Sequence, residues 1–199
     1  MMTLIKRIII FLFVFIALVL FGLYRYYIND VLRYEPLIHE DLKAVGLEEY
    51  TPLLLGLVMQ ETKGKGSDPM QASESLGLAK EAIKDPEKSV QQGVRHFSDV
   101  YAYGQKQHVD LATIVQSYNM GISYIDYVKN HGGHHTQELA KSFSLAKVKA
   151  NPNLYTCKNN PNNFRYPYCY GDFTYSEKVL KKAKYFELYE KIKDRLKQN

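Results

Sequence analysis

The residue with the clearest chemical potential is Glu61, which ends an apolar stretch and precedes a polar, turn-rich segment. Residues 53–59 are all apolar or glycine, whereas residues 64–69 include two glycines, an aspartate and a proline. A carboxyl group in the last turn of a buried helix is hard to ionise, because burial and the helix dipole both raise its pKa. Such a group can serve as a general acid near neutral pH. A glutamate at a helix end is more often solvated, so this helix alone does not establish catalysis.

A second chemical signal follows at Tyr118 and Asn119, just before Gly121. These two side chains can hydrogen-bond a substrate, and a glycine leaves room for it to approach. Taken alone, the combination is also ordinary for the end of a helix.

The two signals together resemble the lysozyme-like superfamily of goose-type lysozymes and soluble lytic transglycosylases. In that superfamily a helix ends in a catalytic glutamate, a loop with Gly-Leu-Met-Gln follows, and Ala-Tyr-Asn-x-Gly comes later. Glu61, Met70-Gln71 and Tyr118-Asn119-Met120-Gly121 match these elements in order. The resemblance covers roughly residues 40–190.

A closer resemblance is to the CwlT-type muramidase domain of Gram-positive bacteria and to the pneumococcal vaccine antigen A group. Their pattern is Met-Gln-Glu-Ser-x-Gly-x-Gly-x-Asp-Pro-Met-Gln-x-Ser-Glu. Residues 59–74 reproduce it with one departure, Thr62 in place of the serine, which keeps a hydroxyl group.

This resemblance implies cleavage of the β-1,4 bond between N-acetylmuramic acid and N-acetylglucosamine, with Glu61 protonating the leaving oxygen. A second carboxylate often assists glycosidases, and Asp68 and Glu74 are the candidates for orienting a water. Asp68 could instead be a turn residue before a proline, and Glu74 a solvated loop acid. The substrate contacts that the resemblance implies are Gln71, Ser73, Tyr118 and Asn119. It implies no cofactor and no metal.

Several functions fit this pattern. We expect a muramidase, in which water attacks the sugar. The alternatives are a lytic transglycosylase, in which the sugar's own 6-hydroxyl attacks, a non-catalytic surface protein that binds the cell wall, and an assembly factor that opens the wall for secretion machinery.

A membrane anchor is expected near the N-terminus, because Ile8 to Tyr24 is a nearly continuous apolar run. Lys6 and Arg7 precede it, which predicts a cytoplasmic N-terminus and an extracytoplasmic remainder. No small-x-small cleavage site follows the run, so an uncleaved single-pass anchor in the cell membrane is favoured over a signal peptide. The expected division is a cytoplasmic tip at 1–7, an anchor at 8–24, a stalk at 25–39 and a catalytic domain at 40–199.

The charge of the chain gives no support to nucleic-acid binding. The formal net charge is +5, but Lys6, Arg7 and Arg25 flank the apolar run. Without these three, 23 basic residues stand against 21 acids, which is too weak an excess for a nucleic-acid partner.

The remaining elements read as helices, so we expect an all-α domain. Thr51-Pro52, Asp85-Pro86, Asp110 and Thr136 are typical helix starts, with the first residue of each as the expected N-cap. A final helix is expected from Glu177 to about Lys197. Cys157 and Cys169 could form a disulfide in an exported protein, although spacing alone cannot show that they meet.

Two other segments could bind ligands. Residues 131–135 contain three histidines and two glycines, and we interpret them as a glycine-rich turn in preference to a metal site. The aromatic residues of 155–175 could stack on sugars, but more often such residues pack a loop onto the core.

Overall fold

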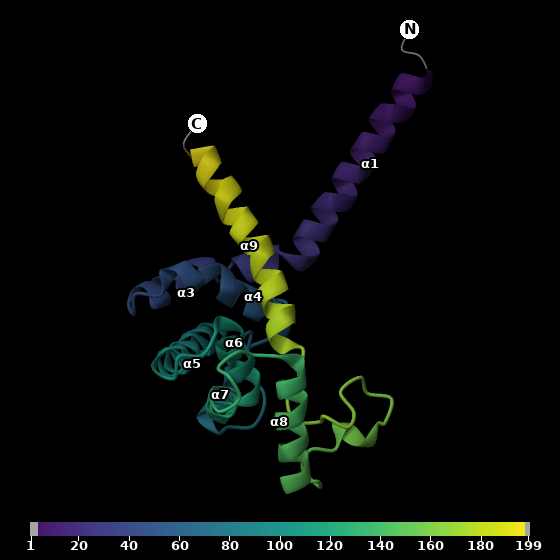
Figure 1. Ribbon diagram of the computed structural model, residues 1–199. Coiled ribbons are helices and arrows are strands. Elements are labelled where there is room, and N and C mark those ends of the chain that lie inside the picture. The colour runs from purple at the N-terminus through teal and green to yellow at the C-terminus, as the bar shows by residue number, and fades with distance from the viewer. Residues whose placement is uncertain (1–3, 198–199) are drawn as a thin grey trace.

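The computed structural model describes residues 4–197, and this part of the chain is built of helices and loops without a strand (Figure 1). The all-α prediction is therefore confirmed. The α-helices are α1 (Leu4–Tyr27), α2 (Asn29–Leu32), α3 (Glu35–Lys43), α4 (Thr51–Glu61), α5 (Pro86–Lys106), α6 (Leu111–Met120), α7 (Ser123–Lys129), α8 (Gln137–Ala150) and α9 (Tyr175–Lys197). Short 3-10 turns are η1 (Glu48–Tyr50), η2 (Ala72–Leu76) and η3 (Cys157–Asn159).

Three predicted helix starts are confirmed by side-chain caps. The carboxylate of Asp85 accepts the amide of Glu87, that of Asp110 accepts the amide of Thr113, and the hydroxyl of Thr136 accepts the amide of Leu139. Each cap satisfies a backbone donor that the first turn leaves without an intrahelical partner.

The start of α4 differs from the expectation that Thr51 is its N-cap. The helix already includes Thr51, and its N-cap residue is Tyr50. The physical reason is η1, which leads directly into α4. The Thr51 hydroxyl therefore donates back to the Glu48 carbonyl at 2.7 Å instead of capping the helix.

Helix α4 is the centre of the core. Every residue from Thr51 to Val58 is buried, and α9 packs along it (Figure 1). The two backbones approach closely at Gly56, where an added Cβ would lie 2.8 Å from the backbone nitrogen of Ala183. Helices α3, α5 and α6 complete the packing around this pair.

Residues 25–39, expected to form a stalk, include α2 and the start of α3. Val31 and Ile38 are fully buried in the core, and Tyr34 is nearly so. This segment therefore packs as part of the helical body, because its apolar side chains repeat at helical spacing. The division of the chain into domains otherwise stays a prediction, and the first three residues of the expected cytoplasmic tip lie outside the described residues.

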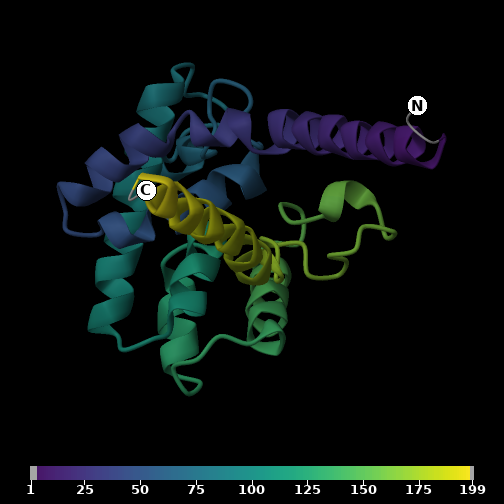
Figure 2. The same ribbon diagram turned by 90° about the horizontal axis from the view of Figure 1, so that it is seen from above.

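Helix α1 extends away from the body (Figures 1 and 2). Its segment Leu4–Gly22 has a mean hydropathy of 2.8, and none of it is buried against the protein. It is long and apolar enough to cross a membrane.

Candidate active site

Glu61 is the last residue of α4, and the chain turns sharply after it. Lys63 and Gly64 both have positive φ angles, of 58° and 74°. At Gly64 an added Cβ would lie 2.3 Å from the carbonyl oxygen of Asp30. Only a glycine allows the chain to pass so close to α2 in this conformation, so Gly64 sets the path of the loop that follows Glu61.

Tyr175, the first residue of α9, holds the Glu61 carboxyl group. Its hydroxyl donates to Oε1 of Glu61 at 2.5 Å. Burial raises the pKa of Glu61, and the charges of Glu74 and Asp68 raise it further, whereas the Tyr175 hydrogen bond and Lys80 lower it. Burial dominates, so the pKa of Glu61 lies above its ordinary value of 4.5. The direction expected from the sequence is confirmed.

Glu61 faces a cavity of about 360 Å³. Its walls come from the end of α4, the loop through η2, α5, the end of α6 and the loop between α8 and α9. The lining residues are Glu61, Gln71, Ala72, Glu74, Ser75, His96, Tyr118, Asn119, Gly121, Tyr155 and Tyr170. Five of the seven predicted site residues thus come together here, and the two others do not line the cavity.

Those two others, Asp68 and Ser73, bond to each other instead. Asp68 is 2% exposed, and its carboxylate accepts the backbone amides of Ala72 and Ser73 and the hydroxyls of Ser73 and Ser89. Burial alone would raise the pKa of Asp68, but these four hydrogen bonds outweigh it and lower the pKa below 3.8. The Ser73 hydroxyl also accepts the amide of Ile83. Both side chains therefore organise the loop, and neither is placed to contact a ligand in the cavity.

Gln71 has the left-handed backbone conformation, with φ of 48°. Its side-chain nitrogen donates to the Asp68 carbonyl at 3.0 Å. Its Oε1 atom is buried and has no hydrogen-bond partner in the described part of the chain. A buried acceptor in a cavity wall is suited to a ligand donor.

The end of α6 supplies Tyr118 and Asn119. The Tyr118 hydroxyl donates to the Met70 carbonyl at 3.1 Å, which ties α6 to the loop after Glu61. The Asn119 side-chain oxygen accepts the amide of Asp172 at 2.7 Å. These bonds explain why Tyr118 and Asn119 stand together at the cavity.

Four functional residues were not identified individually from the sequence: His96, Tyr155, Tyr170 and Tyr175. His96 packs against Tyr118 with ring centroids 4.9 Å apart, and it carried no signal in the helical pattern of α5. The tyrosines belong to the aromatic segment for which both stacking and packing were considered. Tyr170 lines the cavity, and it also packs the loop onto the body through its contact with the Phe143 ring and its hydroxyl, which donates to the Met120 carbonyl at 2.8 Å.

The loop that carries Tyr155 and Tyr170 is closed by a disulfide between Cys157 and Cys169, with Cα atoms 5.0 Å apart. His135, part of the histidine-rich turn, bonds to the hydroxyls of Tyr124 and Ser176. Within residues 4–197, no group of three or more histidine, cysteine or acidic side chains is placed to hold a metal ion.

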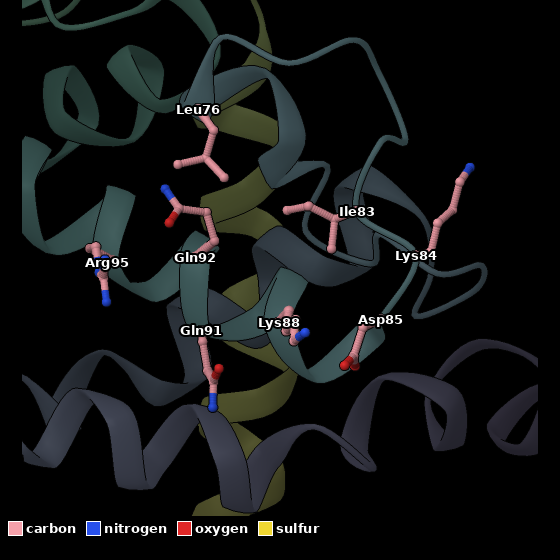
Figure 3. Close-up of a pocket in the computed structure, with 8 residues that line it drawn as sticks. All are labelled: Leu76, Ile83, Lys84, Asp85, Lys88, Gln91, Gln92 and Arg95. Carbon is pink, nitrogen blue, oxygen red and sulfur yellow. The ribbon is translucent and has the colours of Figure 1, made fainter.

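A second hollow of about 470 Å³ lies between α5 and the chain that leads into it (Figure 3). Lys84, Lys88 and Arg95 give it a basic lining. Asp85 is the one carboxylate among its lining residues, and it caps α5. This hollow therefore offers no proton donor comparable to Glu61.

Comparison with known proteins agrees with this geometry. Residues 28–183 match the Lysozyme-like family. The chain is 58% identical to the membrane protein YocA of Bacillus subtilis, over 77% of this chain and 68% of YocA. It is 36% identical to a pneumococcal vaccine antigen A homolog of Streptococcus pyogenes, over 74% of each chain.

Two further matches cover smaller parts of larger proteins. The bifunctional muramidase/DL-endopeptidase CwlT of Bacillus subtilis is 36% identical, over 58% of this chain and 34% of CwlT. A crystal structure of a protein similar to lipoprotein, NLP/P60 family, from Staphylococcus aureus superimposes with a TM-score of 0.68 at 35% identity, covering 77% of this chain and 52% of that one. With its family match spanning the helical body and the glutamate-bearing cavity, the chain belongs to the Lysozyme-like family.

Proposed function

We propose that this protein is a membrane-anchored peptidoglycan hydrolase that cleaves the β-1,4 bond after N-acetylmuramic acid, with Glu61 as general acid. The observation that carries the proposal is the partly buried Glu61 carboxyl, whose pKa is raised beside a cavity with polar and aromatic walls. Membership of the Lysozyme-like family and the similarity to the muramidase CwlT support it.

The hydrogen bond from Tyr175 gives the two oxygens of Glu61 different roles. In the protonated acid, Oε1 accepts from Tyr175, which leaves Oε2 to carry the proton towards the leaving oxygen. After the transfer, the same hydrogen bond stabilises the carboxylate, because hydrogen bonds to an ionised group favour the charged form. Tyr175 is therefore a positioning residue that acts through Glu61.

We do not assign the orientation of a water to Asp68, because it does not line the cavity and its carboxylate already accepts the hydrogen bonds that organise the loop. Glu74 is exposed and lines the cavity, so we assign it the orientation of an attacking water. Attack by the sugar's own 6-hydroxyl would not require a second carboxylate. A lytic transglycosylase therefore remains the alternative.

Substrate contacts in this proposal come from Gln71, Tyr118 and Asn119. The unpaired Oε1 of Gln71 accepts an N–H or O–H of the sugar. Tyr155 and Tyr170 offer ring faces on which the apolar face of a sugar can stack.

The proposed location is the cell membrane, with α1 as a single span and the helical body outside. Lys6 and Arg7, just before the apolar run, support a cytoplasmic N-terminus in this proposal. The Cys157–Cys169 disulfide suits an extracytoplasmic compartment, where such bonds persist.

Product analysis of digested cell walls tests the proposal. The wild type should release fragments with reducing N-acetylmuramic acid ends, and Glu61→Gln should lower the rate at least 100-fold, since general acid catalysis contributes ~10²–10⁴. Glu138→Gln, which alters an exposed carboxylate away from the cavity, is the matched control and should be fully active. Fragments that are lighter by one water and carry 1,6-anhydro ends would show that the enzyme is a lytic transglycosylase and would contradict hydrolysis. Equal release by the wild type and Glu61→Gln would refute an enzymatic role for Glu61.

A further inference from the structure

The C-terminal half of α9 carries an apolar stripe that no part of the described chain covers. Its members are Tyr185, Leu188, Ile192 and Leu196, with exposed fractions of 52%, 57%, 50% and 73%. Intervals of three and four residues place these side chains on one side of the helix. A stripe of this length on a helix end is suited to an apolar partner.

An adjacent side of the same turns packs against the body. Phe186 is 1% exposed, and Lys193 forms an ion pair with Glu35 of α3. Lys193 also lies over the ring of Tyr189. These contacts hold α9 in one rotation about its axis, so the apolar stripe points away from the body.

The middle of α9, at Tyr189, lies near the end of α1. The pKa of Tyr189 is raised by burial and by Glu35, and Tyr24 of α1 is close enough to add to the effect. Tyr24 comes two residues after the apolar span Leu4–Gly22. Figure 1 shows α1 and the last turns of α9 leaving the same side of the body, and Figure 2 shows that the two helices diverge as they leave it. The turns after Tyr189 therefore lie at the level where α1 would enter a bilayer.

The charges around the stripe favour an anionic surface. Lys184 and Lys191 are exposed, and at 100° per residue they lie along one edge of the stripe. Glu187 and Asp194 lie on the far side of the helix by the same spacing. A basic edge beside an apolar stripe is the pattern of helices that lie in the surface of anionic membranes.

We propose that α9 from Tyr185 to Leu196 lies on the anionic lipid surface, as a second membrane contact beside α1. This goes beyond the proposed hydrolysis and rests on α1 as the anchor. Because α9 begins at Tyr175, which bonds to Glu61, one rigid helix links the membrane contact to the cavity. From Tyr175 to Ile192 the helix rises at most about 26 Å, at 1.5 Å per residue. The cavity is thereby held close to the membrane, where it reaches only glycan near the lipid.

The chain contains no tryptophan, so a single introduced tryptophan reports its own surroundings. Full-length Ile192→Trp, Glu187→Trp and Phe13→Trp are reconstituted into vesicles of phosphatidylglycerol or of phosphatidylcholine, each with and without brominated acyl chains. Ile192→Trp tests the stripe, Glu187→Trp tests the far side of the same helix, and Phe13→Trp tests α1. Fluorescence emission and its quenching by bromine are measured.

In phosphatidylglycerol, Ile192→Trp should show blue-shifted emission and at least threefold stronger quenching than Glu187→Trp, and the difference should shrink in phosphatidylcholine. Phe13→Trp should be quenched in both lipids. Equal quenching of Ile192→Trp and Glu187→Trp, with Phe13→Trp quenched, overturns the α9 contact and leaves the anchor intact. Unquenched Phe13→Trp overturns the anchor and this proposal with it, while wall hydrolysis remains separately measurable. A blue shift of Ile192→Trp without quenching would assign the stripe to a second copy of the chain and overturn the lipid contact.

Discussion

Glu61 is subject to opposing influences on its proton. Burial and the neighbouring acids Glu74 and Asp68 favour the neutral acid, whereas Tyr175 and Lys80 favour the carboxylate. A general acid needs both, because it must hold its proton before the reaction and release it during the reaction. The groups around Glu61 therefore set its pKa, and with it the pH range in which the proposed enzyme works.

The raised pKa of Glu61 predicts an alkaline limit to activity. The working form is protonated, so the rate should fall as pH rises through the pKa, with a midpoint above the ordinary value of 4.5 and a slope approaching tenfold per pH unit. The rate of fragment release from soluble peptidoglycan is measured between pH 4 and 8. A rate that only increases across this range would contradict Glu61 as the acid.

Tyr175→Phe removes one hydroxyl group and keeps the ring. Since the Tyr175 hydrogen bond lowers the pKa of Glu61, its loss should move the alkaline limit to higher pH. The maximal rate should fall about tenfold, because a hydrogen bond to a charged group is worth ~1.5–3 kcal/mol. Tyr103→Phe is the matched control, since the hydroxyl of Tyr103 also donates to a carboxylate, that of Asp126, and Tyr103 does not line the cavity. A lower rate with an unmoved pH limit would mean that Tyr175 supports only the fold.

At the scale of elements, the loop after α4 depends on one carboxylate. Asp68 gathers donors from Ala72, Ser73 and Ser89, and so joins η2 to the start of α5. The cavity wall is built on this link, because Gln71 and Glu74 lie within the same loop.

Asp68→Asn should destabilise the fold by about 2–3 kcal/mol at pH 7, because an amide nitrogen would face donors that now bond to a carboxylate. The folded pKa of Asp68 lies below its ordinary 3.8. Its stabilising contribution is therefore present above pH 3.8 and is lost as pH falls through the lower, folded value. Urea unfolding at pH 7 and at pH 3 should show a smaller difference between the wild type and the variant at pH 3. Asp85→Asn, which retains a good helix cap, is the control, and an equally large loss there would argue against a special role for Asp68.

Gly56→Ala tests the crossing of α4 and α9. Alanine favours an isolated helix by about 1 kcal/mol, but its Cβ would lie 2.8 Å from the Ala183 backbone nitrogen. Overpacking of this kind costs ~1–3 kcal/mol, and we expect a net loss of stability in thermal unfolding. Gly22→Ala in α1 meets no atom within 4 Å and should be neutral. A stabilised Gly56→Ala would show that the helices separate without cost.

At the scale of the whole molecule, the apolar span and the helical body are structurally independent over Leu4–Gly22, which is not buried against the protein. The body instead begins with α2 and α3, whose Val31 and Ile38 fill the core. Anchoring and folding are thus carried by different segments of one chain.

Removal of residues 4–22 should leave the thermal midpoint unchanged and abolish stable membrane insertion. The shortened protein should bind phosphatidylglycerol vesicles weakly through α9, and salt should release it, because charge attraction is screened. Sedimentation with vesicles and thermal unfolding measure both effects. A midpoint lower by more than about 5 °C, equivalent to roughly 1–2 kcal/mol, would show that α1 supports the body.

The amino-acid sequence by itself determined the local features. The helix starts at Asp85, Asp110 and Thr136 and the apolar span follow from residues close together in the chain. The apolar run before Glu61 indicated the direction of its pKa shift, but the burial that dominates this shift comes from the fold. Caps and hydrophobic periodicity act over one or two turns, so they can be identified from the sequence without knowledge of the fold. The order of the motif elements along the chain also indicated the family.

Only the tertiary structure decided which distant residues contact the residues of the candidate site and the core. Tyr175 lies 114 residues from Glu61 in the chain, and no local sequence pattern predicts their contact. Asp68 resembles a catalytic carboxylate in the sequence, yet the fold supplies it with four donors. Gly56 resembles a weak point in a helix, yet it permits a close approach of the α4 and α9 backbones. The physical reason is the same in each case: burial and hydrogen bonding depend on which distant segments pack together, and spacing along the chain does not encode that packing.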